Sequence, residues 1–397
     1  MNNFFKNQEA IKLQLERVLE PIEHSLGLSN AFYTDEQVFN FERDQVMSKE
    51  WAAISFLSDL KKPGYVKPVD FMGLPLVIVR DKNDQVKVFH NVCSHRGMKL
   101  VHEEGENHGV MVCPYHAWSY NLEGELKGTP HIGGVDKHTD ERFNCKSNGL
   151  REVRSFIWFG MVFVNICGQA PEFLEAIQPL TERWAEFLGP YGMSAWVEAD
   201  DCKHQLEVNC NWKLAVDNYC EAYHLPWVHP ALNSYSRLED HYNILFADNF
   251  AGQGSYVYNL AEVSGTALPV LDTWPQEKIR HAEYVALFPN VLLGIQADHA
   301  FAMILEPINA TKTTEHLRLF YVGEASAKAD KYKQNRAEVL ESWRVVFAED
   351  IGAVEGMQAG RKSPAYQGGA FSPVLDQPTH YFHQWNARRY LEALKSA

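Results

Sequence analysis

The chain has 397 residues, of which 46% are hydrophobic and 22% charged, as in an ordinary globular protein rather than a disordered one. Its formal net charge of -14 disfavours nucleic acid and an anionic membrane as partners, because both require a basic face. The longest apolar run, residues 156–164, is about half of a membrane-spanning helix, the N-terminus lacks a signal-peptide core, and seven cysteines without a regular spacing favour the reducing cytoplasm.

The first fifty residues are predicted to be largely helical, and the spacing of Thr34 and Gln37 resembles a capping box that starts the second helix. From residue 51 to 165 the pattern changes to short segments of alternating polar and apolar residues, such as QVKVFHNV, separated by Gly, Asn and Asp turns. This pattern is typical of a small antiparallel β domain.

The part of the chain from residue 166 onward mixes helix and strand signals. The predicted elements are a helix over 171–192, a strand running into a helix over 202–224, strands within 250–323, and a long helix over 329–363. A β domain followed by a mixed domain is therefore the expected plan, and the expected fold class is α+β.

Two short motifs in the β domain carry metal-ligand residues. CSHRG supplies Cys93 and His95, and after an interval of seventeen residues CPYHAWSY supplies Cys113 and His116. A structural zinc site is the simpler alternative, but zinc fingers usually pair two ligands of one type in each loop. A [2Fe–2S] cluster of the Rieske type needs the mixed arrangement, because two histidines replace two cysteines on one iron. The motifs therefore predict a Rieske cluster.

A second group of ligand-type side chains lies in the stretch DNYCEAYHLPWVHP. On a helix Asp217, Glu221 and His224 are spaced i, i+4 and i+7, and they share one face. His229 falls well away from that face. Pro226 is expected to end or kink the helix, which lets the following chain return His229 toward His224. The spacing predicts a metal-binding histidine pair formed across a helix break.

A mononuclear non-haem iron site needs a third protein ligand, usually a carboxylate, and keeps other positions open. The candidates are Asp350 and its neighbours Glu349 and Glu355 in the last long helix. Glu221 is better placed to hold the imidazole N–H of His224 and to set its tautomer. The alternative is that both histidines are ordinary buried residues.

Together these motifs resemble the catalytic α subunit of the Rieske non-haem iron oxygenases, or ring-hydroxylating oxygenases, over nearly the whole chain. The resemblance implies three parts: an N-terminal helical segment, 1–50, packed on the catalytic domain; a Rieske [2Fe–2S] β-sandwich domain, 51–165; and a helix-grip catalytic domain with an antiparallel sheet, 166–397, holding mononuclear iron(II). It also implies electrons supplied from NAD(P)H by a separate reductase, and a homotrimer or a mixed α/β hexamer.

Matching the family motif residue by residue assigns His224, His229 and Asp350 as the iron ligands. Glu221 matches the carboxylate that, in the family, links an iron-bound histidine to a Rieske histidine of the adjacent subunit. Here that Rieske histidine would be His116. The resemblance places this bridge on the path of the electrons between subunits.

The remaining assignments are looser. Asn218 matches an asparagine near the iron, Tyr219 an aromatic pocket position, and Asp217 is grouped with them as a catalytic candidate. Glutamate at position 221, where many members have aspartate, resembles the branch that acts on carnitine, stachydrine and related betaines. A cationic substrate favours aromatic faces, for which Tyr219, Trp227 and Tyr235 are the candidates.

The expected function is that of the terminal component of a monooxygenase or dioxygenase. It would use O2 and reductase-delivered electrons to hydroxylate or N-demethylate a small quaternary ammonium (betaine-like) substrate. One alternative is hydroxylation of an aromatic ring or aromatic acid, which requires a more uniformly apolar pocket. A second alternative is a non-catalytic Rieske electron carrier, which would need only the first pair of motifs.

Overall fold

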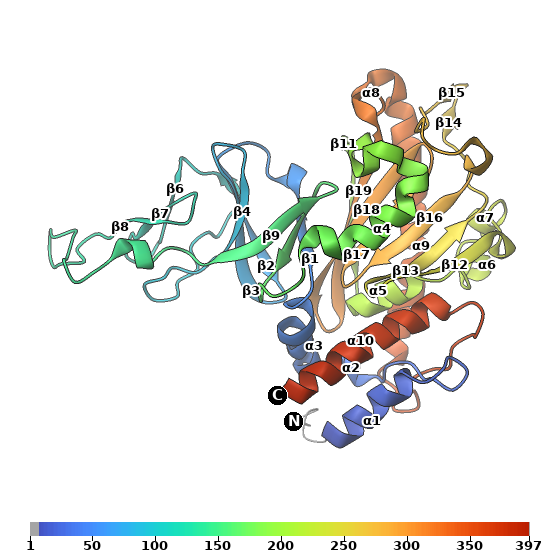
Figure 1. Ribbon diagram of the computed structural model, residues 1–397, viewed down its shortest axis with the longest axis horizontal. Coiled ribbons are helices and arrows are strands. Elements are labelled where there is room, and N and C mark those ends of the chain that lie inside the picture. Colours follow the sequence, from blue (N-terminus) through green and yellow to red (C-terminus); the bar gives the residue numbers. More distant parts are fainter. Residues whose placement is uncertain (1–7, 397) are drawn as a thin grey trace. The chain divides into compact units, whose positions relative to one another are not determined.

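The computed structural model describes residues 8–396, and Figure 1 shows the elements within its two compact units. One unit comprises Ala53–Ala170. The other combines the described residues up to Ala52 with those from Pro171 onward, so the N-terminal helices belong with the second half of the chain. The boundaries expected from the sequence, after residues 50 and 165, lie a few residues before these limits.

The smaller unit is built almost entirely of β-strands. Its elements are β1 Ala52–Phe56, the 3₁₀ turn Leu57–Asp59, β2 Tyr65–Phe71, β3 Leu74–Arg80, β4 Val86–His90, β5 Gly105–Glu106, β6 Val110–Val112, β7 Ser119–Asn121, β8 Leu126–Gly128, the 3₁₀ turn Cys145–Ser147, β9 Glu152–Trp158 and β10 Met161–Asn165. A seven-stranded sheet has the order β1-β10-β9-β4-β3-β2-β5, and a three-stranded sheet has the order β6-β7-β8. The alternating apolar residues of these strands form one buried core.

The larger unit surrounds a second antiparallel sheet. Its strands are β11 Trp196–Val208, β12 His241–Leu245, β13 Phe250–Ser255, β14 Glu262–Val263, β15 Thr266–Ala267, β16 Ala282–Leu287, β17 Val291–Ile295, β18 His299–Asn309 and β19 Lys312–Val322. Seven of them pair in the order β11-β19-β18-β17-β16-β13-β12, while β14 and β15 form a separate hairpin. From β13 the chain crosses the sheet through β16, β17, β18 and β19, each antiparallel to the one before, and β19 pairs with β11, the first strand of this sheet along the chain.

Helices complete the larger unit. They are α1 Gln8–Val18, α2 Ala31–Thr34, α3 Glu36–Glu42, a π turn Arg43–Met47, α4 Phe173–Leu188, α5 Trp212–Tyr219, α6 Leu225–Val228, α7 Pro230–Asn233, α8 Gly323–Lys328, α9 Lys333–Gly360 and α10 Gln377–Ser396, with 3₁₀ turns at 189–195, 238–240, 276–278 and 330–332. α1 and α10, from opposite ends of the chain, lie side by side (Figure 1). The cap of α3 is Asp35, which accepts the N–H of Gln37, and not the predicted Thr34.

The long helix α9 is buried along one face, which carries both apolar side chains and a carboxylate. Its buried side chains recur at intervals of three, four and seven residues, which places them on one stripe of the helix. The stripe includes Val339, Trp343, Phe347 and Val354. Asp350 falls on the same stripe, so the pattern places a carboxylate among apolar neighbours. A carboxylate in such a position needs partners to offset its loss of hydration.

A buried ion pair joins three helices of the larger unit. Lys213 of α5 lies 2.5 Å from Glu42 of α3, and neither side chain is exposed to solvent. Glu42 also accepts hydrogen bonds from Trp212 and from Tyr390 of α10. Because the charge of Glu42 has no access to water, its stability depends on these partners.

We expect Lys213→Met to destabilise the larger unit by about 3–5 kcal/mol, since it leaves the buried carboxylate of Glu42 without a cation. Chemical denaturation followed by tryptophan fluorescence would measure the change. Lys312→Met is the matched control, because Lys312 pairs with Glu207 at 2.8 Å on the surface, where such a pair contributes less than about 1 kcal/mol. Equal effects of the two substitutions would contradict the role of the buried pair.

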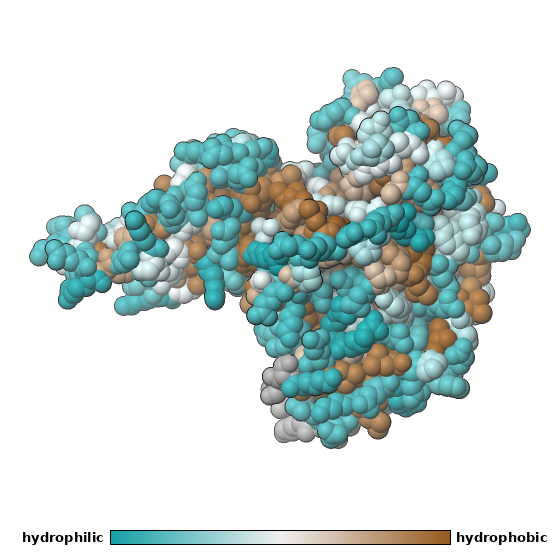
Figure 2. All heavy atoms as spheres, in the orientation of Figure 1, coloured by the Kyte–Doolittle hydropathy of each residue, from teal (hydrophilic) through white to brown (hydrophobic). Residues whose placement is uncertain are grey.

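Hydrophilic residues cover most of the face drawn in Figure 2, in keeping with the net charge of -14. Among the helices that the structure describes, none combines the length and the apolar character needed to cross a membrane.

Candidate iron centres

Two loops of the smaller unit carry the four predicted cluster ligands, and they share one backbone design. In the first loop the N–H of Gly97 donates to the carbonyl of Cys93 at 3.0 Å. In the second loop the N–H of Ala117 donates to the carbonyl of Cys113, also at 3.0 Å. Gly97 and Ala117 both have positive φ, 72° and 55°, a conformation that glycine adopts freely and alanine only with strain. The repeated turn presents one cysteine and one histidine from each loop.

The side chains of these loops meet the requirements of an iron–sulfur cluster. Both cysteines are buried, and the rings of His95 and His116 lie 4.6 Å apart. Burial, together with the neighbouring His116, lowers the pKa of His95, which favours its neutral ring. The Nδ1 atoms of both histidines are buried and make no hydrogen bond within the described residues. A buried polar atom needs a partner, so these two nitrogens fit as ligands of the histidine-bound iron.

The spacing of the ligand atoms argues against the zinc alternative. One zinc ion would hold four ligand atoms at about 2.0–2.3 Å, and hence close to one another. Within residues 8–396, the only group of three or more candidate ligands whose atoms all lie within 4.8 Å of one another is found in the other unit. A two-iron cluster does not need such a compact group, because the cysteines bind one iron and the histidines bind the other.

Tyr120, on β7, adds a hydrogen bond to this centre. Its hydroxyl lies 3.2 Å from Cys93 Sγ and 2.9 Å from Ser94 Oγ. Burial raises the pKa of Tyr120 to about 12, so the phenol keeps its proton at neutral pH. A metal-bound thiolate has no proton to give, and Tyr120 is therefore the donor to Cys93.

We expect Tyr120→Phe to lower the reduction potential of the cluster, because a hydrogen bond to a ligand sulfur stabilises the reduced, more negative state. A redox titration followed by visible circular dichroism would measure the shift. Tyr65→Phe is the control, since the Tyr65 hydroxyl contacts Glu104 at 3.2 Å and not a cluster ligand. An unchanged potential in Tyr120→Phe would contradict the assignment.

The helix that leads to the second centre ends earlier than predicted. α5 stops at Tyr219. A new turn begins there because the carboxylate of Glu221 accepts the backbone N–H groups of Tyr223 and His224. Pro226 then lies in the first turn of α6, where its missing N–H leaves no donor unpaired. The prediction that Pro226 breaks the helix is wrong: the break lies at Cys220, and Pro226 is the second residue of the next helix, Leu225–Val228.

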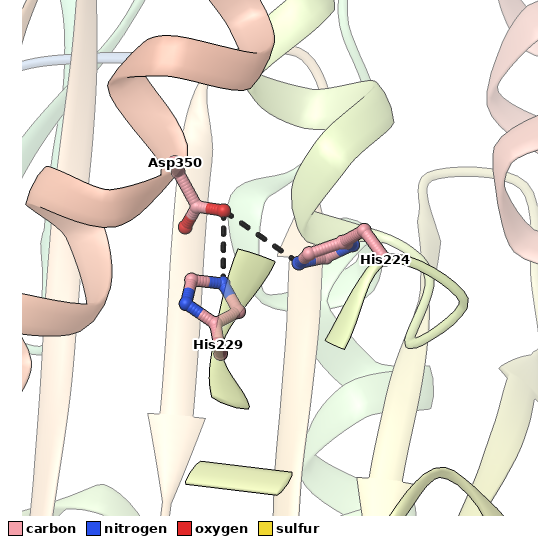
Figure 3. Close-up of side chains that lie close together, drawn as sticks. All are labelled: His224, His229 and Asp350. Atoms are coloured by element: carbon pink, nitrogen blue, oxygen red, sulfur yellow. Dashed lines mark hydrogen bonds and ion pairs between the residues drawn. The ribbon is translucent and has the colours of Figure 1, made fainter. Parts of the chain in front are cut away.

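This irregular segment brings His224 and His229 to one place. Their rings lie 5.1 Å apart at 70° to each other. Asp350 Oδ1 is 3.0 Å from His229 Nε2 and 3.6 Å from His224 Nε2. Figure 3 shows the carboxylate of Asp350, on α9, directed at both imidazoles. The ligand atoms of the three residues lie within 4.8 Å of one another, the donor set of a two-histidine, one-carboxylate iron site.

Two further carboxylates hold the other ring nitrogens. Glu221 Oε1 lies 2.7 Å from His224 Nδ1. Glu349 Oε2 lies 2.8 Å from His229 Nδ1. A carboxylate at Nδ1 draws the ring proton to that nitrogen and leaves the Nε2 lone pair free, which is typical of a metal-bound histidine. Both the triad and the two carboxylates that hold its histidines are therefore arranged as they would be around a bound metal.

The three acidic residues of α9 that were candidates for the third iron ligand differ in their contacts. Asp350 faces both Nε2 atoms, and Glu349 holds an Nδ1 atom. Glu355 lies elsewhere and accepts hydrogen bonds from the backbone and side-chain N–H groups of Asn209, at 2.9 and 2.8 Å. The geometry favours Asp350 as the third ligand.

Asn218 and Asp217 contact different residues, although they are adjacent in the chain. Asn218 Nδ2 donates to Asp350 Oδ1 at 2.8 Å, so it contacts the triad. Asp217 accepts a hydrogen bond from Tyr33 at 3.3 Å and lies 3.1 Å from His383 Nε2. Asp217 therefore contacts this buried pair, and it is not among the three residues of the triad.

A pocket adjoins the triad, whose three side chains form part of its lining. The lining also includes four aromatic side chains, from Tyr219, Tyr284, Trp343 and Phe347, and three aliphatic ones, from Leu225, Leu232 and Val346. Tyr219, one of the three predicted substrate residues, lines this pocket. The other two predicted aromatic residues do not line this pocket: Trp227 is 72% exposed and Tyr235 is 40% exposed.

Several pocket residues were not identified from the sequence. Trp343 and Phe347 precede Asp350 by seven and three residues on α9, a helical spacing that could have revealed them. Ser236, His241, Gln253 and Tyr284 come from separate loops and strands, and no local pattern in the sequence brings them together. Ser236, His241 and Gln253 are hydrogen-bonded to one another and form a polar end of the pocket, and the aromatic residues, including Tyr284, form its wall.

A cysteine–histidine cluster site in one unit and a two-histidine, one-carboxylate site in the other define the class of Rieske non-haem iron oxygenases. The chain belongs to the ring hydroxylating alpha subunit family, whose catalytic domain matches residues 194–392. Residues 50–139 match the Rieske [2Fe-2S] domain. The predicted family, fold class and cofactors are confirmed by these matches.

Three relatives illustrate the similarity along the chain. The carnitine monooxygenase oxygenase subunit of Acinetobacter pittii (strain PHEA-2) is 27% identical over 345 residues, which cover 85% of this chain and 85% of the relative. The chloroplastic choline monooxygenase of Arabidopsis thaliana is 26% identical, with 91% and 82% covered. The glycine betaine monooxygenase oxygenase subunit of Pseudomonas aeruginosa (strain PAO1) is 24% identical, with 95% and 92% covered.

Solved structures share the fold. A quaternary ammonium Rieske monooxygenase matches with a TM-score of 0.76 at 24% identity, covering 94% of this chain and 98% of that one. Naphthalene 1,2-dioxygenase from Rhodococcus sp. matches with a TM-score of 0.73 at 16% identity, covering 98% of both. Because one fold carries such different substrates, the substrate must be argued from the pocket.

Proposed function

We propose that this chain is the terminal oxygenase of an NAD(P)H-dependent system that hydroxylates or N-demethylates a small quaternary ammonium compound. The observation that carries the proposal is an aromatic pocket directly beside the triad of His224, His229 and Asp350. A quaternary ammonium group binds to aromatic faces, which attract its charge without needing hydrogen bonds. The carnitine, choline and glycine betaine enzymes among the relatives support this substrate class.

In this proposal His224, His229 and Asp350 hold iron(II), and the four cysteine and histidine residues of the smaller unit hold the cluster. Iron held there would supply oxygen activation, with two electrons delivered through the cluster and two protons, so that one oxygen atom would enter the substrate and the other would leave as water. Glu221 and Glu349 keep the imidazole protons on Nδ1. Tyr219 and the other wall residues orient the cation and exclude water from the reacting carbon.

The oxygenase needs partners. We propose a separate reductase as the electron donor and a homotrimer in which Glu221 of one subunit meets His116 of the partner subunit, with the assembly located in the cytoplasm. A solved quaternary ammonium Rieske monooxygenase has been described in terms of inter-subunit electron transfer. Glu221 already contacts the iron-site histidine at 2.7 Å, so this contact would supply the nearer half of such a bridge.

The test is substrate-dependent NADH oxidation by the purified chain with a Rieske-oxygenase reductase, combined with detection of formaldehyde or released amine. Quaternary ammonium compounds are expected to support turnover, and benzoate and other aromatic acids are not. Turnover of aromatic acids alone would favour the ring-hydroxylation alternative, to which the apolar part of the wall would also be suited. A chain that bound only the cluster irons would favour the electron carrier.

A further inference from the structure

The pocket beside the triad offers no permanent positive charge of its own. In the part of the chain that the structure describes, the residues lining it include neither lysine nor arginine. Its histidine outside the triad, His241, has a pKa that burial lowers, which favours the uncharged ring. A substrate carboxylate would therefore find no basic side chain to pair with.

Hydrogen bonds show how the uncharged His241 is held. Its Nδ1 lies 2.7 Å from Gln253 Oε1, which can only accept, so the ring proton is on Nδ1. Its Nε2 then accepts from Ser236 Oγ at 3.0 Å. Gln253 Nε2 donates in turn to the carbonyl of Glu221 at 3.1 Å. This end of the pocket is a row of neutral donors and acceptors, suited to a hydroxyl or carbonyl group of the substrate.

A chain of hydrogen bonds holds one of the aromatic side chains in place. The Trp343 indole N–H donates to His299 Nε2 at 2.8 Å, and His299 Nδ1 lies 2.8 Å from Asp298 Oδ1. Because Nε2 accepts, the ring proton of His299 is on Nδ1. The other Asp298 oxygen accepts the backbone N–H of Ala261 at 2.8 Å. The orientation of Trp343 is therefore fixed before a substrate binds.

A quaternary ammonium group needs no hydrogen-bond partner and can lie against the aromatic side chains of the lining. A carboxylate needs charged or multiple N–H donors, and the lining offers it no basic side chain.

Because the lining combines aromatic side chains with a neutral polar row and has no lysine or arginine, we propose that the pocket selects, within the quaternary ammonium class, substrates that lack a carboxylate. The cationic end lies against Tyr219, Tyr284 and Trp343, and a neutral polar end, such as an alcohol, meets Ser236 and His241. The inference rests on the proposed function and narrows it: choline has the required chemistry, while glycine betaine and carnitine carry the disfavoured carboxylate.

Binding to the holoenzyme, measured by isothermal titration calorimetry without reductase, tests the proposal with matched ligands. Choline is expected to bind at least about tenfold more tightly than glycine betaine, its carboxylate counterpart. Choline should also bind more tightly than its neutral carbon isostere, because the wall is expected to attract the positive charge. Equal or tighter binding of glycine betaine or carnitine would overturn the inference and leave the proposed function intact. If none of these cations binds, the proposed function itself fails and the inference fails with it.

A charge-introducing variant gives a second, independent measurement. His241→Lys places a cation at the polar end of the pocket and is expected to shift the choline-to-betaine affinity ratio toward betaine by at least about tenfold. His316→Lys is the control, because His316 pairs with Glu306 at 2.7 Å on β19 and does not line the pocket. Circular dichroism would confirm that both variants fold. An unchanged ratio in folded His241→Lys protein would show that position 241 does not face the substrate tail.

Discussion

Replacing Asp350 with alanine is expected to remove one iron per chain and to reduce turnover by more than about 100-fold. Loss of a residue that only supports a metal ligand reduces activity by up to about 100-fold, and loss of the ligand itself should cost more. Asp350 is the carboxylate that faces the Nε2 atoms of both His224 and His229. Without it the site keeps two neutral ligands, which hold iron(II) weakly. The cluster ligands belong to the other unit of the chain and should be unaffected.

Iron and acid-labile sulfide analysis measures this outcome directly. The wild-type chain should hold about three irons and two sulfides, and Asp350→Ala about two of each. Glu355→Ala is the matched control, because Glu355 is an acidic residue of the same helix that contacts Asn209. If Glu355→Ala lost the iron while Asp350→Ala kept it, the assignment of the third ligand would be wrong.

Replacing Glu221 with alanine is expected to preserve both metal centres and to reduce turnover by about 100-fold or more. Glu221 holds His224 at Nδ1 and, in the proposed trimer, connects it to His116 of the partner subunit. Electron transfer slows steeply with distance and with the loss of a hydrogen-bonded path. The rate of cluster oxidation after mixing the reduced, substrate-bound protein with O2 would measure this step.

Glu349→Ala provides a control that matches the local contact. Glu349 holds His229 at Nδ1, at 2.8 Å, as Glu221 holds His224 at 2.7 Å. Both substitutions remove a carboxylate that orients an iron-site histidine, but only Glu221 is proposed to carry electrons between subunits. We expect slow cluster oxidation in Glu221→Ala alone. If both variants slowed it equally, Glu221 would have only an orienting role.

The cluster site was predictable because it depends on short motifs. Each loop supplies its ligands within a few residues, and a tight turn at Gly97 or Ala117 returns the chain to the preceding cysteine. The α+β plan was predictable for a similar reason, since alternating strands and the stripe of α9 are local patterns. Long-range geometry was not needed for either.

The iron site was predictable in its residues but not in its backbone. His224 and His229 were expected to meet across a break at Pro226, whereas the helix ends at Tyr219. The deciding interaction is the side chain of Glu221, which accepts N–H groups of the following turn. Helical periodicity does not include such a competing hydrogen bond, and it therefore extended the helix too far.

The pocket was the least predictable part. Trp227 was a candidate only because it is close to the histidines in sequence, and the short helix α6 leaves it largely exposed. Tyr284 reaches the pocket from β16, and His241 from β12. Their approach depends on strand order and register, which arise from the packing of the whole sheet.

One rigid rod, α9, carries the pocket aromatics Trp343 and Phe347 and also Asp350. A ligand that shifts the helix on contact with the two rings would also shift the carboxylate that faces the histidines. Substrate binding is then expected to change the electronic spectrum of the ferrous site even without direct contact between the substrate and the metal. Such mechanical coupling would let the enzyme delay oxygen uptake until its substrate has arrived.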